Sequence, residues 1–182
     1  MSDDIIPDDI IPDEKDWTWV LATPCPECGY RSDSVEVSET GPLIRENTAV
    51  WLEVLRRDDV RRRPSTAIWS PLEYACHVRD VHVLYLQRLE MMLEQDGPHY
   101  PNWDQDATAV AERYHEADPR TVAEQLVAAA GALADRFDRV RDDEWARTGH
   151  RSDGAAFTVT TFARYFLHDP VHHLHDVGAS ST

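Results

Sequence analysis

The sequence predicts an all-α fold, namely a four-helix bundle that follows a non-helical N-terminal extension. Four long segments place apolar residues at three- and four-residue steps, which is the period of an amphipathic helix. No convincing run of alternating apolar and polar residues, the pattern of a half-buried strand, accompanies them. A length of 182 residues suits one domain with a sizeable core and is short for two. These observations together favour a bundle of four helices.

Composition divides the chain into three parts. Residues 1–16 contain the unit Asp-Asp-Ile-Ile-Pro twice, and a proline every five residues blocks a helix while the paired acids disfavour a strand. We therefore expect a flexible acidic arm, with docking through its isoleucine pairs as the alternative. Residues 17–40 form the extension, which carries a Cys-x-x-Cys segment, and residues 41–178 form the bundle.

The first two helices have clear signals. Apolar residues recur at helical spacing from Leu43 to about Arg57. The second helix is predicted over Pro71–Glu94, because Ser70 supplies an N-cap, proline occupies the first helical position, and Glu73 completes a capping box.

A third long helix follows a connection of some twenty residues, which includes a short helix at about Thr108–Tyr114. The third helix starts between Asp118 and Thr121, and it continues to about Val140. Its many alanines permit close packing against its neighbours.

The fourth long helix is predicted over Phe157–Val177, after a loop at residues 147–154. Pro170 falls inside this helix and removes one backbone hydrogen bond. Two interpretations remain open: the proline kinks the helix, or a new helix begins there with proline in its first turn.

Charge and composition exclude several classes of function. A net charge of −16 argues against nucleic-acid binding, because a phosphate backbone would be repelled, and it disfavours anionic membrane surfaces. No apolar run approaches the roughly 20 residues of a membrane helix, and the N-terminus lacks a signal-peptide pattern, so we expect a cytoplasmic protein. Three cysteines do not indicate a disulfide framework in a reducing compartment.

The histidines near the C-terminus form the most distinctive pattern in the sequence. His168 and His172 stand four residues apart, so both imidazoles lie on one helix face within reach of a common metal ion. His77, on the second helix, is the best candidate for a third ligand. His173 and His175 leave the set open, because either could replace His172 as a ligand.

Asp80 lies one turn beyond His77, where it is placed to accept the free N–H of a ligating imidazole. The alternative to a metal site is that these residues are ordinary interior or surface histidines of an acidic protein. Spacing on one helix does not separate the two interpretations.

Cys25 and Cys28 are the candidates for a separate zinc or redox site. The sequence Cys-Pro-Glu-Cys-Gly is similar to one knuckle of a zinc ribbon, in which glycine lets backbone N–H groups turn toward the thiolates. The second knuckle is missing, since Cys76 is the only other cysteine and lies in a helix. Zinc would need His or Asp partners, or the same pair from a second subunit. The alternative is a reduced, packed turn.

Two stretches carry a resemblance to a known family. Trp69-Ser-Pro-Leu-Glu-Tyr-Ala-Cys-His77-Val-Arg-Asp80 resembles the second-helix signature of the DinB-like superfamily, which includes bacillithiol transferases and mycothiol-dependent maleylpyruvate isomerases. His168-Asp-Pro-Val-His172 resembles its fourth-helix His-x-x-x-His motif. The resemblance covers about residues 40–178. It implies a four-helix bundle in which one histidine of the second helix and two of the fourth hold a divalent metal, here His77, His168 and His172.

The chain departs from the family pattern at two places. Many members follow the last histidine with Arg-Gly-Gln, whereas this chain continues His173-Leu-His-Asp, which leaves open a register with His173 as the ligand. The Cys-x-x-Cys segment is not part of the general pattern. The resemblance also implies a homodimer, since members of the family are often dimers.

Our first hypothesis is a metal-dependent thiol S-transferase-like enzyme, whose partners are a small thiol and an electrophilic substrate. A three-histidine site suits Zn, Ni, Fe or Mn, of which we favour Zn or Ni, and the bound ion would lower the pKa of the thiol. Lys15 is the only lysine, which indicates a GC-rich genome, and in such a source the resemblance favours mycothiol. The alternative is a non-catalytic bundle that binds a metal or ligand and acts through protein contacts.

Overall fold

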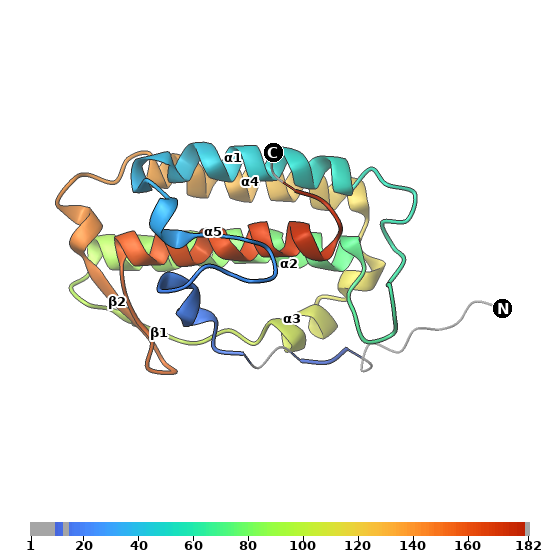
Figure 1. Cartoon of the computed structure of the whole chain (residues 1–182), viewed down its shortest axis with the longest axis horizontal. Coiled ribbons are helices and arrows are strands. Elements are labelled where there is room, and N and C mark those ends of the chain that lie inside the picture. The colour runs from blue at the N-terminus through green and yellow to red at the C-terminus, as the bar shows by residue number, and fades with distance from the viewer. Residues whose placement is uncertain (1–9, 13–14, 181–182) are drawn as a thin grey trace.

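Four long helices form the body of the molecule, as the sequence predicts. The computed structural model describes residues 10–12 and 15–180, and most of the predicted acidic arm lies outside the described residues. In Figure 1, α1 and α4 form one layer of the bundle, and α2 and α5 form the other. The helices are α1 (Thr40–Val54), α2 (Pro71–Glu94), α3 (Gln105–Ala111), α4 (Pro119–Phe137) and α5 (Val159–Asp176), of which α3 is short.

The capping box predicted for α2 is present. The Ser70 hydroxyl oxygen accepts a hydrogen bond from the Glu73 backbone N–H at 3.3 Å, and the Glu73 carboxylate accepts one from the Ser70 N–H at 2.8 Å. Together with Pro71 at the first helical position, these bonds satisfy orphan N–H groups, which is why the predicted boundaries of α2 are correct. The first helix begins and ends three residues earlier than the predicted Leu43–Arg57.

The core lies between the two layers. Apolar positions on the inward faces of the helices are fully buried, and aromatic rings stack where α2 meets α5. The largest buried side chains are Trp51, Tyr114, Phe162, Phe166, Ile44, Leu72, Leu89, Met92, Leu126, Leu133 and Leu174. The bundle is therefore held by the helix faces that the sequence period predicts.

A small sheet at one end of the bundle corrects the prediction of a loop at residues 147–154. It contains β1 (His99–Tyr100), β2 (Thr148–Arg151) and β3 (Ala156–Thr158), in that spatial order. Strand β1 pairs with β2 in parallel, and β2 pairs with β3 as an antiparallel hairpin. Strands this short cannot show the alternating pattern by which strands are recognised in a sequence.

Two glycines give a matched test of packing at this end. A Cβ at Gly149 would lie 2.7 Å from the Met92 Cγ, whereas a Cβ at Gly131 in α4 would meet nothing within 4 Å. Gly149→Ala should therefore destabilise the fold by about 1–3 kcal/mol through overpacking. Gly131→Ala should stabilise it by about 0.5–1 kcal/mol, because alanine is the better helix former. Denaturant unfolding measures the change in the free energy of unfolding for both variants. Equal changes would contradict the close contact between Gly149 and Met92.

The extension runs as short 3-10 turns across α5, at Trp17–Leu21, Ser32–Ser34 and Val37–Glu39. The Tyr30 hydroxyl donates to the Arg164 carbonyl oxygen at 2.6 Å, and the Arg164 guanidinium donates to the Val35 carbonyl oxygen at 3.1 Å. These bonds link the extension to the helix that carries the histidines.

Pro170 lies inside one continuous helix, so the interpretation in which a new helix begins at this proline is wrong. The Pro170 carbonyl oxygen accepts a hydrogen bond from the Trp51 indole N–H at 3.4 Å.

Within the described residues, we find no helix with the length and apolar character needed to cross a membrane.

Candidate metal centre

Helix α5 carries two pairs of potential metal ligands that are offset by one residue. His168 and His172 form one pair, and Asp169 and His173 form the other, each with the four-residue spacing that places two side chains on one face. One residue corresponds to a rotation of about 100° around the helix, so the pairs face different neighbours. Each pair meets a different part of the chain.

The second pair meets His77 of α2. Ligand-capable atoms of His77, Asp169 and His173, which we call the Asp169 cluster, all lie within 4.8 Å of one another. The Oδ2 of Asp169 lies 3.2 Å from the Nε2 of His77 and 3.9 Å from the Nε2 of His173. Two ligands of one tetrahedral zinc ion lie about 3.4 Å apart, given bond lengths of about 2.0–2.2 Å. The three atoms are therefore close to the spacing of a common coordination shell.

Neighbouring side chains fix the orientation of both imidazoles. The Nδ1 of His173 lies 2.8 Å from the Asp176 carboxylate, which leaves Nε2 to face Asp169. The His77 ring is fully buried and stacks on the Trp103 ring, with centroids 5.4 Å apart. Such support from a carboxylate and an aromatic ring is what holds metal ligands in one rotamer.

Electrostatics keep the carboxylates of this region ionised. Burial opposes ionisation of Asp169, but the proximity of His77 and His173 outweighs it and holds the pKa of Asp169 well below its usual range. Burial likewise opposes ionisation of Asp176, and the hydrogen bond from His173 lowers its pKa overall. Both groups are therefore anionic at neutral pH, the state in which a carboxylate binds a metal ion.

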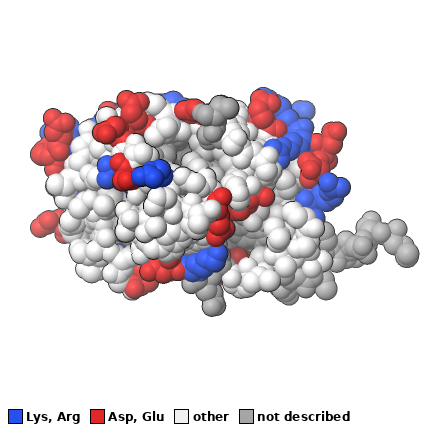
Figure 2. Space-filling view, in the orientation of Figure 1, with Lys and Arg blue, Asp and Glu red and all other residues white. Residues whose placement is uncertain are grey.

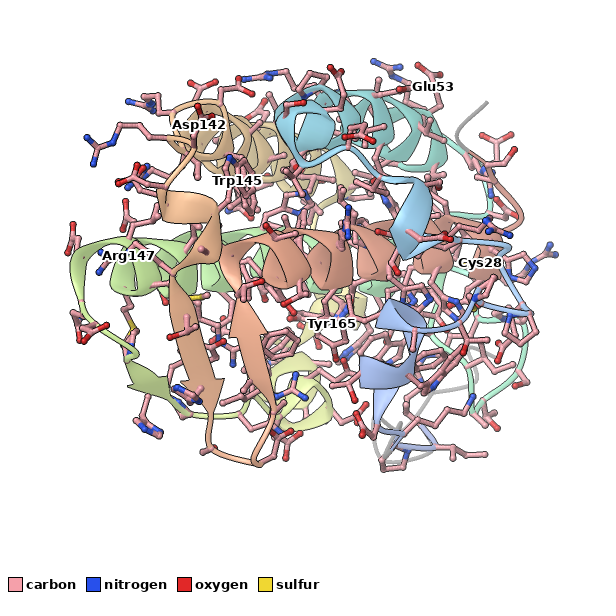
Figure 3. The ribbon with its side chains drawn as sticks, turned by 60° about the vertical axis from the view of Figure 1, so that its left-hand side comes forward. Cys28, Glu53, Asp142, Trp145, Arg147 and Tyr165 are labelled. Atoms are coloured by element: carbon pink, nitrogen blue, oxygen red, sulfur yellow. The ribbon has the colours of Figure 1, made fainter. Side chains whose placement is uncertain are left out.

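The first pair meets the extension instead. Ligand-capable atoms of Cys25, Cys28, His168 and His172, which we call the cysteine cluster, also lie within 4.8 Å of one another. Cys25 Sγ is 3.6 Å from the Nδ1 of His172. In Figure 3, Cys28 lies beside the C-terminal part of α5, which carries both histidines. The partners that the Cys-x-x-Cys segment lacks in sequence thus come from a helix about 140 residues away.

The structure divides the three histidines that the sequence predicts as one site. His77 lies with Asp169 and His173, whereas His168 and His172 lie with the two cysteines. The register that includes His173, one of the alternatives left open by the sequence, is the one that meets His77. His175 is more than half exposed.

Asp80, predicted as the acceptor for a ligating His77, has other partners. Its carboxylate accepts hydrogen bonds from the Arg79 guanidinium at 2.7 Å and from the Tyr114 hydroxyl. Among the described residues, the Nδ1 of His77 has no hydrogen-bond partner. The Asp80 carboxylate is thus engaged by these two donors and not by the imidazole of His77.

A cleft opens onto both clusters. It has a volume of about 890 Å³, within the range of small-molecule sites, and its wall includes His77, Asp169 and His173 together with Trp17, Trp69 and Trp103. On the face in Figure 2, acidic and basic side chains lie next to one another in several places, and residues of neither kind cover much of the rest. The Asp169 cluster is thus placed to contact a small molecule.

Asp169 is the candidate ligand that the sequence reasoning missed. Its signal was present, because Asp169 and His173 have the same four-residue spacing as His168 and His172. A carboxylate beside several histidines in an acidic chain resembles a surface residue, and only its position opposite His77 distinguishes it.

Comparisons with known proteins agree with this architecture. A family model described as the DinB superfamily matches residues 43–177. The solved structure described as "YfiT from Bacillus subtilis is a probable metal-dependent hydrolase with an unusual four-helix bundle topology" superimposes with a TM-score of 0.69 at 17% identity, covering 81% of this chain and 93% of that chain. A mycothiol-dependent maleylpyruvate isomerase superimposes with a TM-score of 0.63 at 15% identity, covering 83% of this chain and 64% of that one. No curated protein matches the chain.

Proposed function

Because the chain belongs to the DinB superfamily, we propose that it is a metal-dependent enzyme that activates a low-molecular-weight thiol at the Asp169 cluster. The observation that carries the proposal is the convergence of His77, Asp169 and His173 on the wall of a small-molecule cleft. The N-terminal extension, residues 17–40, lies outside the residues that the family model matches, and the proposed reaction does not use its two cysteines.

The donor set fits a divalent ion. Two imidazoles and one carboxylate are the ligands of many catalytic zinc sites, and the same set also suits ferrous iron. The buried Oδ1 of Asp169 has no hydrogen-bond partner among the described residues, which is a cost that a second coordinating oxygen would remove. Three protein ligands leave coordination positions open, as catalysis requires.

The residues of the chain have separable roles in this proposal. The Asp176 carboxylate lies 2.8 Å from the Nδ1 of His173, where it would hold a proton on that nitrogen and orient the ring for coordination through Nε2. The rings of Trp69 and Trp103 pack against the His77 imidazole, with centroids 5.5 Å and 5.4 Å away, and the imidazole is fully buried. These contacts preorganise the ligand positions before any substrate enters.

The proposed reaction is a transfer of the thiol sulfur to an electrophilic carbon. His77, Asp169 and His173 would hold a divalent ion, which would supply a Lewis acid and so lower the pKa of a bound thiol. The sulfur forms a bond to the carbon while the bond to a leaving group breaks. The products are a thioether and the leaving group, which takes the proton released by the thiol.

Mycothiol is the thiol that we favour. The maleylpyruvate isomerase with the same fold is mycothiol-dependent by its description, and the arginine-rich composition of this chain suggests a GC-rich source, which favours the same thiol. A non-catalytic bundle that binds a metal or small ligand is the second candidate, and it predicts metal without turnover.

The test compares metal content with thiol consumption. The purified protein should carry a divalent ion and should consume mycothiol with at least one member of a panel of electrophiles, measured as loss of free thiol. His173→Ala should abolish turnover, because it removes one of three ligands, and His175→Ala should retain it, because that side chain is exposed.

Two outcomes would decide against the thiol transferase. Turnover by His173→Ala at the wild-type rate would show that the Asp169 cluster is not the reactive site. Metal at full occupancy with no turnover of mycothiol, bacillithiol or glutathione across the panel would support the binding protein instead.

A further inference from the structure

The cysteine cluster is not needed by the proposed reaction, yet its four side chains converge as closely as those of the Asp169 cluster. Cys25, His168 and His172 are buried, with exposed fractions of 1%, 4% and 6%. Cys28 is half-buried. Four polar side chains gathered at the boundary between the extension and α5 are costly unless something binds them.

We propose that Cys25, Cys28, His168 and His172 bind a zinc ion as a closed, four-ligand site that fastens the N-terminal extension to α5. Two thiolates and two imidazoles are a common donor set of structural zinc. Because all four positions are filled by protein, this site leaves none open for a substrate.

The distances fit this donor set. Zinc bonds of about 2.3 Å to sulfur and about 2.05 Å to nitrogen at a tetrahedral angle place the two ligand atoms about 3.6 Å apart. The observed distance from Cys25 Sγ to the Nδ1 of His172 is 3.6 Å. The Nε2 of buried His168 has no hydrogen-bond partner among the described residues, and it is the type of atom that a metal ion would satisfy.

The backbone forms a tight turn around the two cysteines. The Gly29 N–H donates to the Cys25 carbonyl oxygen at 2.9 Å, and Gly29 has a φ of +76°, which a residue with a side chain rarely adopts. The Cys25 N–H donates to the Tyr30 carbonyl oxygen at 2.9 Å, which closes the turn from the other side. This turn holds the two sulfur atoms within 4.8 Å of each other.

Carboxylates surround the outer nitrogen of one histidine. The Nε2 of His172 lies 3.7 Å from Glu27 and 3.8 Å from Asp176, so the nitrogen that does not face Cys25 is close to negative charge. Such an arrangement raises the basicity of a ligating imidazole. Asp176 also contacts His173, so one carboxylate lies between the two clusters.

The zinc site would take no part in the reaction, but it would position one wall of the substrate cleft. The Trp17 ring lies against His168 and His172, with centroids 5.2 Å and 4.9 Å away, and it forms part of the cleft wall. Fastening the extension therefore also fixes Trp17 in the wall of the cleft that the Asp169 cluster lines.

Cobalt substitution tests the proposal. Protein stripped of metal by a chelator and reloaded with Co²⁺ should show the charge-transfer absorption of cobalt–thiolate bonds, which the Asp169 cluster cannot produce. Cys28→Ser should weaken this band and lose about one equivalent of zinc per chain. His77→Ala should retain the band, so failure of the proposed function remains distinguishable from failure of the zinc site. Cys76→Ala is the matched control, because that cysteine is buried in the core and distant in sequence.

Proteolysis tests directly whether zinc holds the N-terminal extension against α5. Arg31 has an exposed side chain and follows the knuckle. Chelation should speed tryptic cleavage at Arg31 more than about tenfold in the wild-type protein, because zinc binding energy is folding energy for the segment it holds. Cys28→Ser should be cleaved fast without chelator.

Three results would overturn the zinc site. They are a cobalt-loaded protein without a thiolate band, a Cys28→Ser variant that keeps its full zinc content, and a protein purified under reducing conditions that contains no zinc at this site.

Discussion

Replacing His77 with alanine should lower thiol turnover more than about 100-fold, since loss of even an outer partner of a metal ligand costs 10–100-fold. His77 is the one ligand of the Asp169 cluster that α2 supplies, and its Nε2 lies 3.2 Å from the Asp169 carboxylate. Without it, the two remaining ligands both come from α5, and the divalent ion should be lost. Metal content and the rate of thiol consumption measure both effects.

His82→Ala is the matched control for this variant. His82 is also a buried histidine of α2, but its Nδ1 lies 2.6 Å from the Val78 carbonyl oxygen, and its ring packs on Phe166. His82→Ala should lower the free energy of unfolding, but the protein should keep its metal ion. If His77→Ala keeps both metal and turnover, the Asp169 cluster is not the catalytic site.

The His77→Ala variant also tests the single three-histidine site that the sequence spacing predicts. If His77, His168 and His172 held one ion, His77→Ala and His168→Ala would lose the same equivalent of metal. Two separate clusters predict instead that each variant loses a different equivalent, and that the double variant loses both. Metal analysis of the three proteins decides between the two arrangements.

Replacing Glu73 with glutamine should destabilise the fold by about 3–5 kcal/mol, which is typical of breaking a buried ion pair. The side chains of Glu73 and Arg63 are 4% and 5% exposed, and the Arg63 Nε donates to the Glu73 carboxylate at 2.9 Å. Loss of the negative charge leaves the guanidinium buried without compensation. Denaturant unfolding measures the change in the free energy of unfolding.

Glu53→Gln is the matched control. Glu53, labelled in Figure 3, pairs with Arg56, but the two side chains are 72% and 67% exposed, so water screens the interaction. This variant should change stability by no more than about 0.5 kcal/mol. Equal losses in the two variants would contradict a special role for the buried pair.

The buried pair also predicts a dependence on pH. Burial opposes ionisation of Glu73, but hydrogen bonds from Arg63 and Ser70 outweigh it and lower its pKa below the ordinary value of 4.5. The contribution of this carboxylate is therefore fully present above about pH 4.5, and it is lost as the pH falls through the lowered pKa. Glu73→Gln should remove that part of the acid sensitivity.

Much of the fold could be predicted from local signals. The boundaries of α2 follow from Ser70, Pro71 and Glu73, which act within one turn of the chain, and these predictions are confirmed. The strands around Gly149 could not be predicted, because they are too short to carry a period. They depend instead on contacts with the end of α2, where Met92 leaves no room for a Cβ at Gly149.

The candidate sites divide in the same way. By itself, the sequence determined that α5 would present histidines at four-residue spacing and that Cys25 and Cys28 would need distant partners. Only the tertiary structure decided which pair faces which neighbour, since one residue turns a side chain by about 100°. The docking of α5 against α2 directs Asp169 and His173 to His77, and the extension lying across α5 brings the two cysteines to His168 and His172.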